Sequence, residues 1–295
     1  MTTQNIATDA SQKRFLTAQA EQNFEELCEQ YEISTFYRED LGGLIRFEIS
    51  IVIDDSGSMT LNNGSGMSRW DELKSVIKII INLAGCLDAD GIDIYFLNRE
   101  IDPDLLLEHQ RNALAGILDK FGNLNKRVVP KVRTYEDIEW AFQQKPRGYT
   151  PLEETIAPLL VMGGKPGLIL VPTDGMPTDR QGNVLRAEFE KSLKNRDVSK
   201  SCIGILACSN REEDIGYLNG MDKRVKFLDV IDDYASERVD VLKKQKSGFR
   251  YSLGDHVARL LLGPTNDKYD KQDEKRVVQM TAENPNAEGG CCIVS

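Results

Sequence analysis

The chain has 295 residues, a formal net charge of −10, 40% hydrophobic residues and 28% charged residues. This composition is typical of a soluble globular protein, and the length allows one large domain with a sizeable core. The acidic balance argues against nucleic acid as the main partner, because phosphate binding requires a basic surface. It also argues against simple electrostatic adhesion to anionic lipid.

The N-terminal sequence MTTQNIATDASQKRF contains no apolar core, so it predicts no secretory signal. Thr2 stands where N-myristoylation requires glycine. The longest apolar stretch, residues 76–87, is interrupted by Lys78 and Asn82 and is too short to span a bilayer. We therefore expect a cytoplasmic protein, in which Cys28, Cys86, Cys202 and Cys208 are small buried apolar residues in a reducing compartment.

Helical and strand patterns alternate along the chain. A helix is predicted over residues 11–31, then a strand over 44–53 in which isoleucines recur at alternate positions. Ser68 is a predicted N-cap for a long helix over 69–88, and Thr134 with Asp137 fits a second capping pattern. The remaining predicted strands cover residues 92–97, 167–171, 202–208 and 225–230, and the remaining predicted helices cover 105–119, 135–143, 151–162, 184–193, 212–218 and 253–262.

This alternation predicts an α/β fold, a Rossmann-like doubly wound and mostly parallel sheet flanked by helices. In such sheets ligands bind at the carboxyl ends of the strands. We divide the chain into an N-terminal helical extension (1–40), one α/β domain (41–265) and a polar, flexible tail (266–295).

A group of oxygen-bearing side chains follows the first strong strand directly. Asp54, Ser56 and Ser58 stand at alternate positions, so their side chains converge if the loop curls, and Gly57 gives the backbone the freedom to do so. Carboxylate and hydroxyl oxygens suit a hard cation such as Mg²⁺. Taken alone, this segment also fits an ordinary Asp/Ser/Gly turn.

Two further motifs accompany it in the chain. Gly148-Tyr149-Thr150-Pro151 precedes a predicted helix, and Thr173-Asp174-Gly175 follows a predicted buried strand. Together with the segment IVIDDSGSM, these two motifs resemble the metal-ion-dependent adhesion site of von Willebrand factor A (VWA) domains. The motifs have the same order and the same placement at strand and helix boundaries as in that family. The resemblance is strongest to the intracellular and fungal members.

The resemblance implies the VWA fold and a role for each site residue. Ser56 and Ser58 would coordinate Mg²⁺ or Mn²⁺ directly, and Thr150 would do so when a ligand is bound. Asp54 and Asp174 would bind directly or through water. One coordination position would remain for an acidic side chain of a protein partner, which a poorly neutralised Mg²⁺ attracts.

Other polar residues are expected to have structural roles. Asp55 occupies the variable position of the first motif and is expected to be solvated or to lie behind the ligands. His109 and His256 fall within predicted helices.

Enzyme functions are less well supported by the sequence. A phosphatase with an aspartyl nucleophile needs a second Asp two residues later, where this chain has Ser56. Residues 64–68 do not form a nucleophile elbow, and Gly163-Gly164-Lys165 lacks the spacing of a phosphate loop. A metal-dependent hydrolase stays as a minor alternative, and we expect no enzyme activity.

The sequence ends in Cys292-Ile293-Val294-Ser295, which fits a Cys-aliphatic-aliphatic-X box for farnesylation of Cys292. The ending GGCCIVS resembles the tails of fungal Ras GTPases, in which the first cysteine, here Cys291, is palmitoylated. A single lipid binds membranes only marginally, so two are expected. The sequence thus predicts a cation-dependent protein-binding module held on a cytosolic membrane face; the alternative is a soluble scaffold with an unmodified tail.

Overall fold

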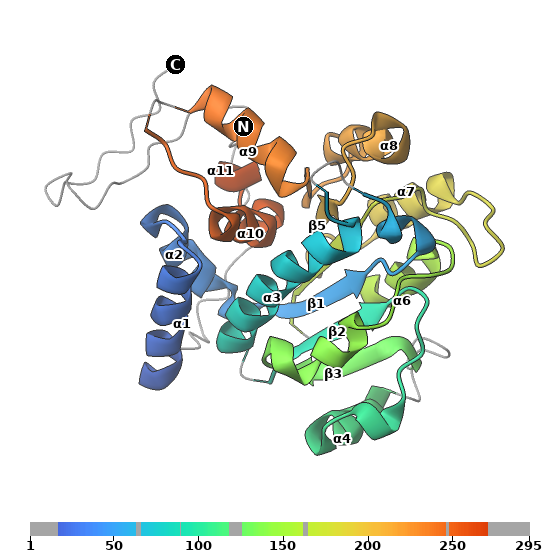
Figure 1. Ribbon diagram of the computed structural model, residues 1–295, viewed down its shortest axis with the longest axis horizontal. Helices are drawn as coiled ribbons and strands as arrows, with labels where there is room; N and C mark the ends of the chain where they lie inside the picture. The colour runs from blue at the N-terminus through green and yellow to red at the C-terminus, as the bar shows by residue number, and fades with distance from the viewer. Residues whose placement is uncertain are drawn as a thin grey trace, which may run out of the picture.

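The computed structural model describes residues 17–62, 66–88, 90–117, 126–161, 165–245 and 248–270. A six-stranded sheet in the order β3-β2-β1-β4-β5-β6 forms the centre of the fold (Figure 1). Neighbouring strands are parallel except for β2 and β3, which pair antiparallel. The strands are β1 Glu48–Ile53, β2 Ile92–Phe96, β3 Val128–Val132, β4 Gly167–Thr173, β5 Ser201–Ala207 and β6 Leu228–Ile231.

The central strands are buried on both faces, which explains their continuous apolar sequences. Every residue of β5 is buried, and in β4 only Gly167 is partly exposed. A parallel sheet covered by helices on both sides requires this pattern, because neither set of side chains faces water. The coarse expectation of an α/β fold with a mostly parallel sheet is therefore confirmed.

Helices cover the sheet on both sides. The helix α3 (Arg69–Leu87) lies in front of β1 in Figure 1 and contacts α10 (Leu253–Leu262), which packs on β4, β5 and β6. The helices α6 (Leu152–Leu160) and α7 (Arg186–Asn195) pack against each other. Right-handed crossovers place α6 and α7 on the face opposite α3, since the chain moves across the sheet in the other direction there.

The outer elements complete these layers. α4 (Glu108–Ile117) contacts β3, and α8 (Glu212–Asp222) contacts β6. The remaining helical elements are α5 Glu139–Phe142, α9 Tyr234–Lys244, α11 Asp267–Asp270 and the short 3₁₀ turns η1 Gly43–Arg46, η2 Gly57–Thr60, η3 Pro103–Leu105, η5 Tyr135–Asp137 and η6 Gly263–Thr265.

Two N-terminal helices join the same hydrophobic core. α1 (Ala18–Gln30) contacts α3, and α2 (Thr35–Gly42) contacts α10. Phe24 of α1 and Tyr37 of α2 are buried in the core cluster that contains the strands. Asn82 of α3 also donates a hydrogen bond to the Tyr31 hydroxyl at 2.8 Å.

Several sequence predictions are confirmed at the level of single residues. The Ser68 hydroxyl accepts from the Asp71 backbone at the start of α3, and Thr134 with Asp137 forms a capping box. Cys28, Cys202 and Cys208 are buried as free thiols, whereas Cys86 is only half-buried.

Other predictions were wrong in detail. The strand expected over 44–53 begins only at Glu48, because residues 43–46 form a 3₁₀ turn that buries Leu44. The elements α2, β3 and α9 were not predicted at all.

Cys291 and Cys292 lie outside the described residues. Within the described ranges, no helix combines the length and the apolar character needed to cross a bilayer.

Candidate metal centre

Asp54 and Asp174 stand at the carboxyl ends of two adjacent strands. Asp54 follows β1 and Asp174 follows β4, and these strands pair in parallel. The strand order reverses between them, since the chain runs from β1 outward to β3 and returns to β4 on the other side of β1. A crevice opens at such a reversal, and ligands of open α/β sheets bind there.

The loop after β1 curls around the Asp54 carboxylate. Asp54 is fully buried, and its Oδ1 accepts a hydrogen bond from the Ser56 backbone N–H at 2.9 Å. Its Oδ2 accepts from the Thr173 hydroxyl of β4 at 2.6 Å. These two bonds fix the Asp54 carboxylate between the two strands and turn Ser56 toward β4.

Two serine hydroxyls connect the loop to Asp174. The Oγ atoms of Ser56 and Ser58 lie 3.0 Å apart, and the Ser58 hydroxyl donates to Asp174 Oδ1 at 2.7 Å. The curl expected from the alternate spacing of Asp54, Ser56 and Ser58 therefore brings their side chains together.

Thr150 reaches the same place from a third segment. A Cβ built on Gly175 would lie 3.6 Å from Thr150 Oγ1 and 3.8 Å from Ser58 Oγ, so both hydroxyls face the Asp174-Gly175 turn. The loop that carries Thr150 is joined to the serine loop by a hydrogen bond from Gly57 N–H to Gly148 O at 3.0 Å. Gly148 has a φ of +92°, and a Cβ there would meet Asn98, so only glycine fits this turn.

The two carboxylates make the site electronegative. Burial raises the pKa of Asp54, and the nearby Asp174 carboxylate raises it further. Burial also raises the pKa of Asp174, although hydrogen bonds from Arg69 and Ser58 act in the opposite direction. Two desolvated carboxylates with only partial compensation favour the binding of a cation.

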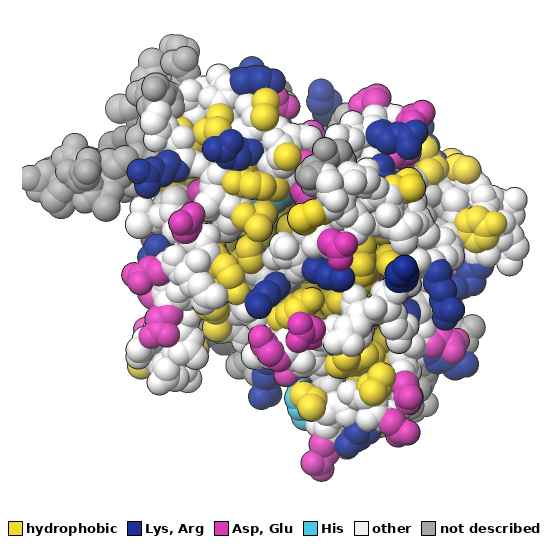
Figure 2. Space-filling model, viewed as in Figure 1, with side chains coloured by type: hydrophobic (Ala, Val, Ile, Leu, Met, Phe, Trp, Pro, Cys, Tyr) yellow, Lys and Arg dark blue, Asp and Glu magenta, His cyan; other side chains and the backbone are white. Residues whose placement is uncertain are grey.

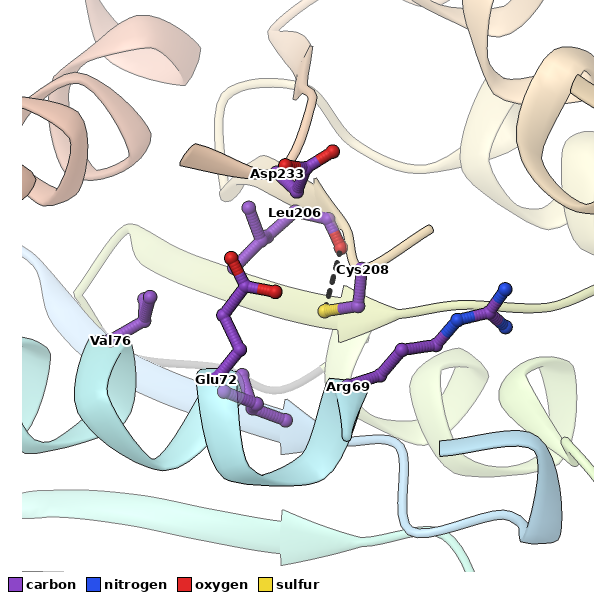
Figure 3. A pocket seen from close by; sticks show the side chains of 7 residues that line it. Arg69, Glu72, Val76, Leu206, Cys208 and Asp233 are labelled. Carbon is purple, nitrogen blue, oxygen red and sulfur yellow. Dashed lines mark hydrogen bonds between the residues drawn. The ribbon is translucent and has the colours of Figure 1, made fainter. Parts of the chain in front are cut away.

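Arg69, at the first position of α3, neutralises part of this charge. Its Nη1 lies 2.6 Å from Asp174 Oδ2, and its Nη2 donates to Ser209 and Asp214 at 2.8 and 2.9 Å. A small cavity lies beside Arg69, lined also by Glu72, Cys208 and Asp233, and Figure 3 shows the guanidinium pointing away from Glu72. Arg69 thus holds one oxygen of Asp174 and leaves the other facing Ser58.

Asp55 has a different role from Asp54. Its carboxylate is buried and accepts from the backbone N–H groups of Asn98 and Arg99 and from Arg99 Nε at 2.8 to 3.0 Å. The guanidinium of Arg99 also lies over the rings of Trp70 and Phe96. Asp55 therefore anchors the loop after β2 behind the candidate site and is not solvated.

The donor set fits a hard cation such as Mg²⁺ or Mn²⁺ better than a softer metal such as Zn²⁺ or copper. Within the described part of the chain, no group of three or more His, Cys, Asp or Glu residues could hold a metal. The five residues Asp54, Ser56, Ser58, Thr150 and Asp174 offer two carboxylates and three hydroxyls, and Mg²⁺ is usually bound through one or two carboxylates with water filling other positions. His109 bonds the Lys131 carbonyl and His256 faces Tyr251, so neither belongs to this set.

Comparisons with known proteins identify no family for this chain and find only distant structural similarity. No family model matches the chain, and no curated protein matches it. Among solved structures, it is similar to the PilB minor pilin of Streptococcus sanguinis, with 13% identity, 66% of this chain and 60% of that chain covered, and a TM-score of 0.39. The D319A mutant of the same pilin is 11% identical to this chain, with a TM-score of 0.45. That match covers 77% of this chain and 62% of the pilin chain. The chain thus spans about three fifths of the pilin chains it matches.

These findings correct the family assignment made from the motifs. The similar structures are of a bacterial pilin, and no family model or curated protein supports a VWA domain, a metal-ion-dependent adhesion site or a Ras-like lipidated tail. The physical reason is that three short motifs of Asp, Ser, Thr and Gly specify a local arrangement of oxygen atoms and not a family. What the structure supports is an α/β fold in which those oxygen atoms converge.

Proposed function

We propose that the chain binds a partner protein through a divalent cation, Mg²⁺ or Mn²⁺, held by Asp54, Ser56, Ser58, Thr150 and Asp174. The observation that carries this proposal is the chain of contacts from Ser56 Oγ to Ser58 Oγ to Asp174 Oδ1, which gathers oxygen atoms from separate loops. A cation inserted there would exchange hydroxyl hydrogen bonds for metal–oxygen bonds at little cost in rearrangement. The sheet that supports the site is proposed to be doubly wound in the Rossmann manner, on the basis of the strand order.

The proposed partner presents a Glu or Asp side chain to the cation. Hydroxyl ligands carry no charge, and Asp174 is already paired with Arg69, so a bound Mg²⁺ keeps much of its positive charge. An incoming carboxylate completes its coordination and gains a charge-assisted bond.

Binding is favoured over catalysis as the role of this site. Asp54 as a nucleophile would need a general acid or base within hydrogen-bond reach. The Ser56 and Thr173 groups that bond Asp54 do not titrate in the required range. The nearby Asp174 carboxylate is held by Arg69 and by the Ser58 hydroxyl. Attachment to a membrane through Cys292 and Cys291 remains a prediction.

The proposal can be tested with the full chain as bait, tagged at its N-terminus. Proteins captured from lysate are quantified by mass spectrometry in Mg²⁺ and in EDTA, with the Asp174→Asn chain as the matched bait. We expect a set of proteins that is present in Mg²⁺ and lost both in EDTA and with Asp174→Asn. The same set captured under all conditions would show that no cation mediates the interaction.

A further inference from the structure

Arg69 divides its guanidinium between two carboxylates instead of closing on one. Its Nη1 lies 2.6 Å from Asp174 Oδ2, and its Nη2 lies 2.9 Å from Asp214 Oδ2. An arginine fork matches both oxygens of one carboxylate, so Arg69 with Asp174 as its only partner would form two parallel bonds to it. The single bond observed here leaves Asp174 Oδ1 to the Ser58 hydroxyl, which donates to it at 2.7 Å. The second carboxylate thus affects which Asp174 oxygen belongs to the candidate metal centre.

Ser209 closes a ring of hydrogen bonds with Arg69 and Asp214. The buried Ser209 hydroxyl accepts from Arg69 Nη2 at 2.8 Å and donates to Asp214 Oδ2 at 2.9 Å. The Arg211 backbone N–H also donates to this hydroxyl, at 3.2 Å. Because Nη2 has two acceptors in this ring, it is held on the side of Asp214 and away from Asp174.

The helix that carries Asp214 is also fastened to the turn that follows Asp174. Asp214 stands in the first turn of α8, and the buried Tyr217, one turn further on, donates from its hydroxyl to the Gly175 carbonyl at 3.1 Å. The first two residues of α8, Glu212 and Glu213, are exposed. Figure 2 shows acidic side chains next to basic ones over α8, which is labelled in Figure 1. Asp214 therefore turns toward the site, while its two acidic neighbours face solvent.

Arg69 has a donor in reserve for a second bond to Asp174. Among the residues that the structure describes, no group accepts a hydrogen bond from its buried Nε. An unsatisfied buried donor costs free energy, so rotation of the guanidinium onto another acceptor is favourable once Nη2 is released. The Asp174 carboxylate, already in contact with Nη1, offers Oδ1 for this purpose. A released Arg69 would compete for Oδ1 with Ser58 and with a cation.

We propose that Asp214 and Ser209 are positioning residues of the cation site, and this inference rests on the proposed function. They hold Arg69 in a single contact with Asp174 and so keep Asp174 Oδ1 available to a divalent cation. Arg69 still neutralises part of the buried charge of Asp174, which stabilises the site when no cation is bound. The pairing of Arg69 with Asp214 thereby sets the affinity of the site for Mg²⁺.

Calorimetric titration of the full chain with Mg²⁺ tests this inference. Asp214→Asn keeps the shape of the side chain but removes the charge that holds Arg69. It should weaken Mg²⁺ binding about tenfold, because Arg69 then closes on Asp174 and competes with the cation. Asp214→Glu keeps the charge and should retain most of the affinity. Unchanged affinity of Asp214→Asn, or an equal loss in Asp214→Glu, would overturn the proposal.

Glu213→Gln is the matched control for this titration. It removes the same charge from the same turn of α8, so its effect on the helix dipole is similar. The Glu213 carboxylate is 66% exposed and pairs with Arg211 instead of Arg69. Glu213→Gln should therefore leave the affinity for Mg²⁺ unchanged. A loss as large as that of Asp214→Asn would show that α8 acts through its net charge and would contradict a role for the Arg69 contact.

A crystal structure of Asp214→Asn in EDTA tests the arrangement without any cation. We expect two guanidinium nitrogens of Arg69 at about 3 Å from the two Asp174 oxygens, with the Ser58 hydroxyl displaced from Oδ1. Arg69 left in a single contact with Asp174 would overturn the proposal. If the unchanged protein binds no Mg²⁺, the proposed function itself fails, and this structure still decides whether Asp214 positions Arg69.

Discussion

Arg69 Nη1 lies 2.6 Å from Asp174 Oδ2, and both side chains are almost completely buried. Arg69 is the first residue of α3, so the long helix and the end of β4 are joined directly at the candidate metal centre. A buried ion pair of this kind costs desolvation energy, but removal of one partner leaves the other charge buried without compensation.

Replacement of Arg69 should therefore destabilise the protein and make it more dependent on a cation. We expect Arg69→Met to lower the free energy of unfolding by about 3–5 kcal/mol in EDTA. Mg²⁺ should restore more stability to this variant than to the unchanged protein, because it replaces the lost positive charge near Asp174. Urea unfolding with and without Mg²⁺ measures both effects.

Arg224→Met is the matched control for this measurement. Arg224 is 46% exposed and pairs with Glu190, so its loss should cost no more than about 1 kcal/mol and should not alter the effect of Mg²⁺. An Arg69 variant that behaves like this control would show that Arg69 does not balance the charge of Asp174.

Substitution of Asp54 and of its neighbour Asp55 should have different effects on stability and on the response to Mg²⁺. Asp54→Asn removes a proposed ligand, so the increase in stability produced by Mg²⁺ should disappear. That increase amounts to about 2.7 kcal/mol when Mg²⁺ is present at a hundred times its dissociation constant. Asp55→Asn breaks the buried pair with Arg99 and should cost about 3–5 kcal/mol, while the Mg²⁺ effect persists.

Thermal unfolding of both variants with EDTA and with Mg²⁺ separates these outcomes. Thr60→Ala is a suitable control, since Thr60 is exposed in the same loop and is not a proposed ligand. If Asp54→Asn retains the full response to Mg²⁺, Asp54 is not part of a metal site.

Mg²⁺ should counteract the pH dependence that Asp54 and Asp174 give to the stability of the protein. The pKa values of Asp54 and Asp174 are raised in the folded state, so the folded protein binds more protons than the unfolded chain above pH 3.8, the usual pKa of an Asp side chain. In EDTA these two groups should make stability fall as the pH rises from about 4 toward neutrality. Mg²⁺ competes with those protons, so its stabilising effect should grow over the same range.

Denaturant unfolding from pH 4 to 8 measures this dependence. Asp88, Asp93 and Asp255 also have raised pKa values, so the contribution of the site is the difference between the unchanged protein and the Asp54→Asn/Asp174→Asn double variant. Parallel curves for the two proteins in EDTA would contradict the electrostatic description of the site.

Thr150, a hydroxyl ligand in the proposed site, should affect binding more than folding. Thr150 is 6% exposed, and its hydroxyl faces the Asp174-Gly175 turn. Thr150→Ala removes one uncharged ligand of the proposed cation, so it should reduce the Mg²⁺ effect on stability less than Asp54→Asn does and should weaken capture of the acidic partner. Equal binding by Thr150→Ala and the unchanged protein would remove Thr150 from the site.

Much of the fold and the local convergence of the site could be predicted from sequence. Buried strands such as β4 appear as continuous apolar runs, and α3 has a recognisable cap at Ser68. The edge strand β3 was missed because Pro130 and Lys131 interrupt its apolar character. A bulge in its pairing with β2 accommodates these residues, as edge strands allow.

The sequence patterns did not predict contacts between segments that are distant in the chain. Arg69 appeared only as the first residue of a helix, and nothing nearby in the sequence indicates that it faces Asp174, Ser209 and Asp214. Thr173 belongs to the recognised Thr-Asp-Gly motif, but its bond to Asp54 depends on the pairing of β1 and β4. The motifs thus predicted which oxygen atoms meet, while the supporting partners follow from the tertiary fold.

The position of the cation is the most direct test of the central claim. Crystals grown or soaked with Mn²⁺ should show one anomalous peak among Ser56, Ser58 and Asp174, about 2.1 Å from the two serine hydroxyl oxygens. The same crystals of Asp174→Asn should lack it. A Mn²⁺ peak elsewhere on the molecule, or an ordered site with water hydrogen-bonded to Ser56 and Ser58 at saturating Mn²⁺, would contradict the proposal that this chain binds through a metal.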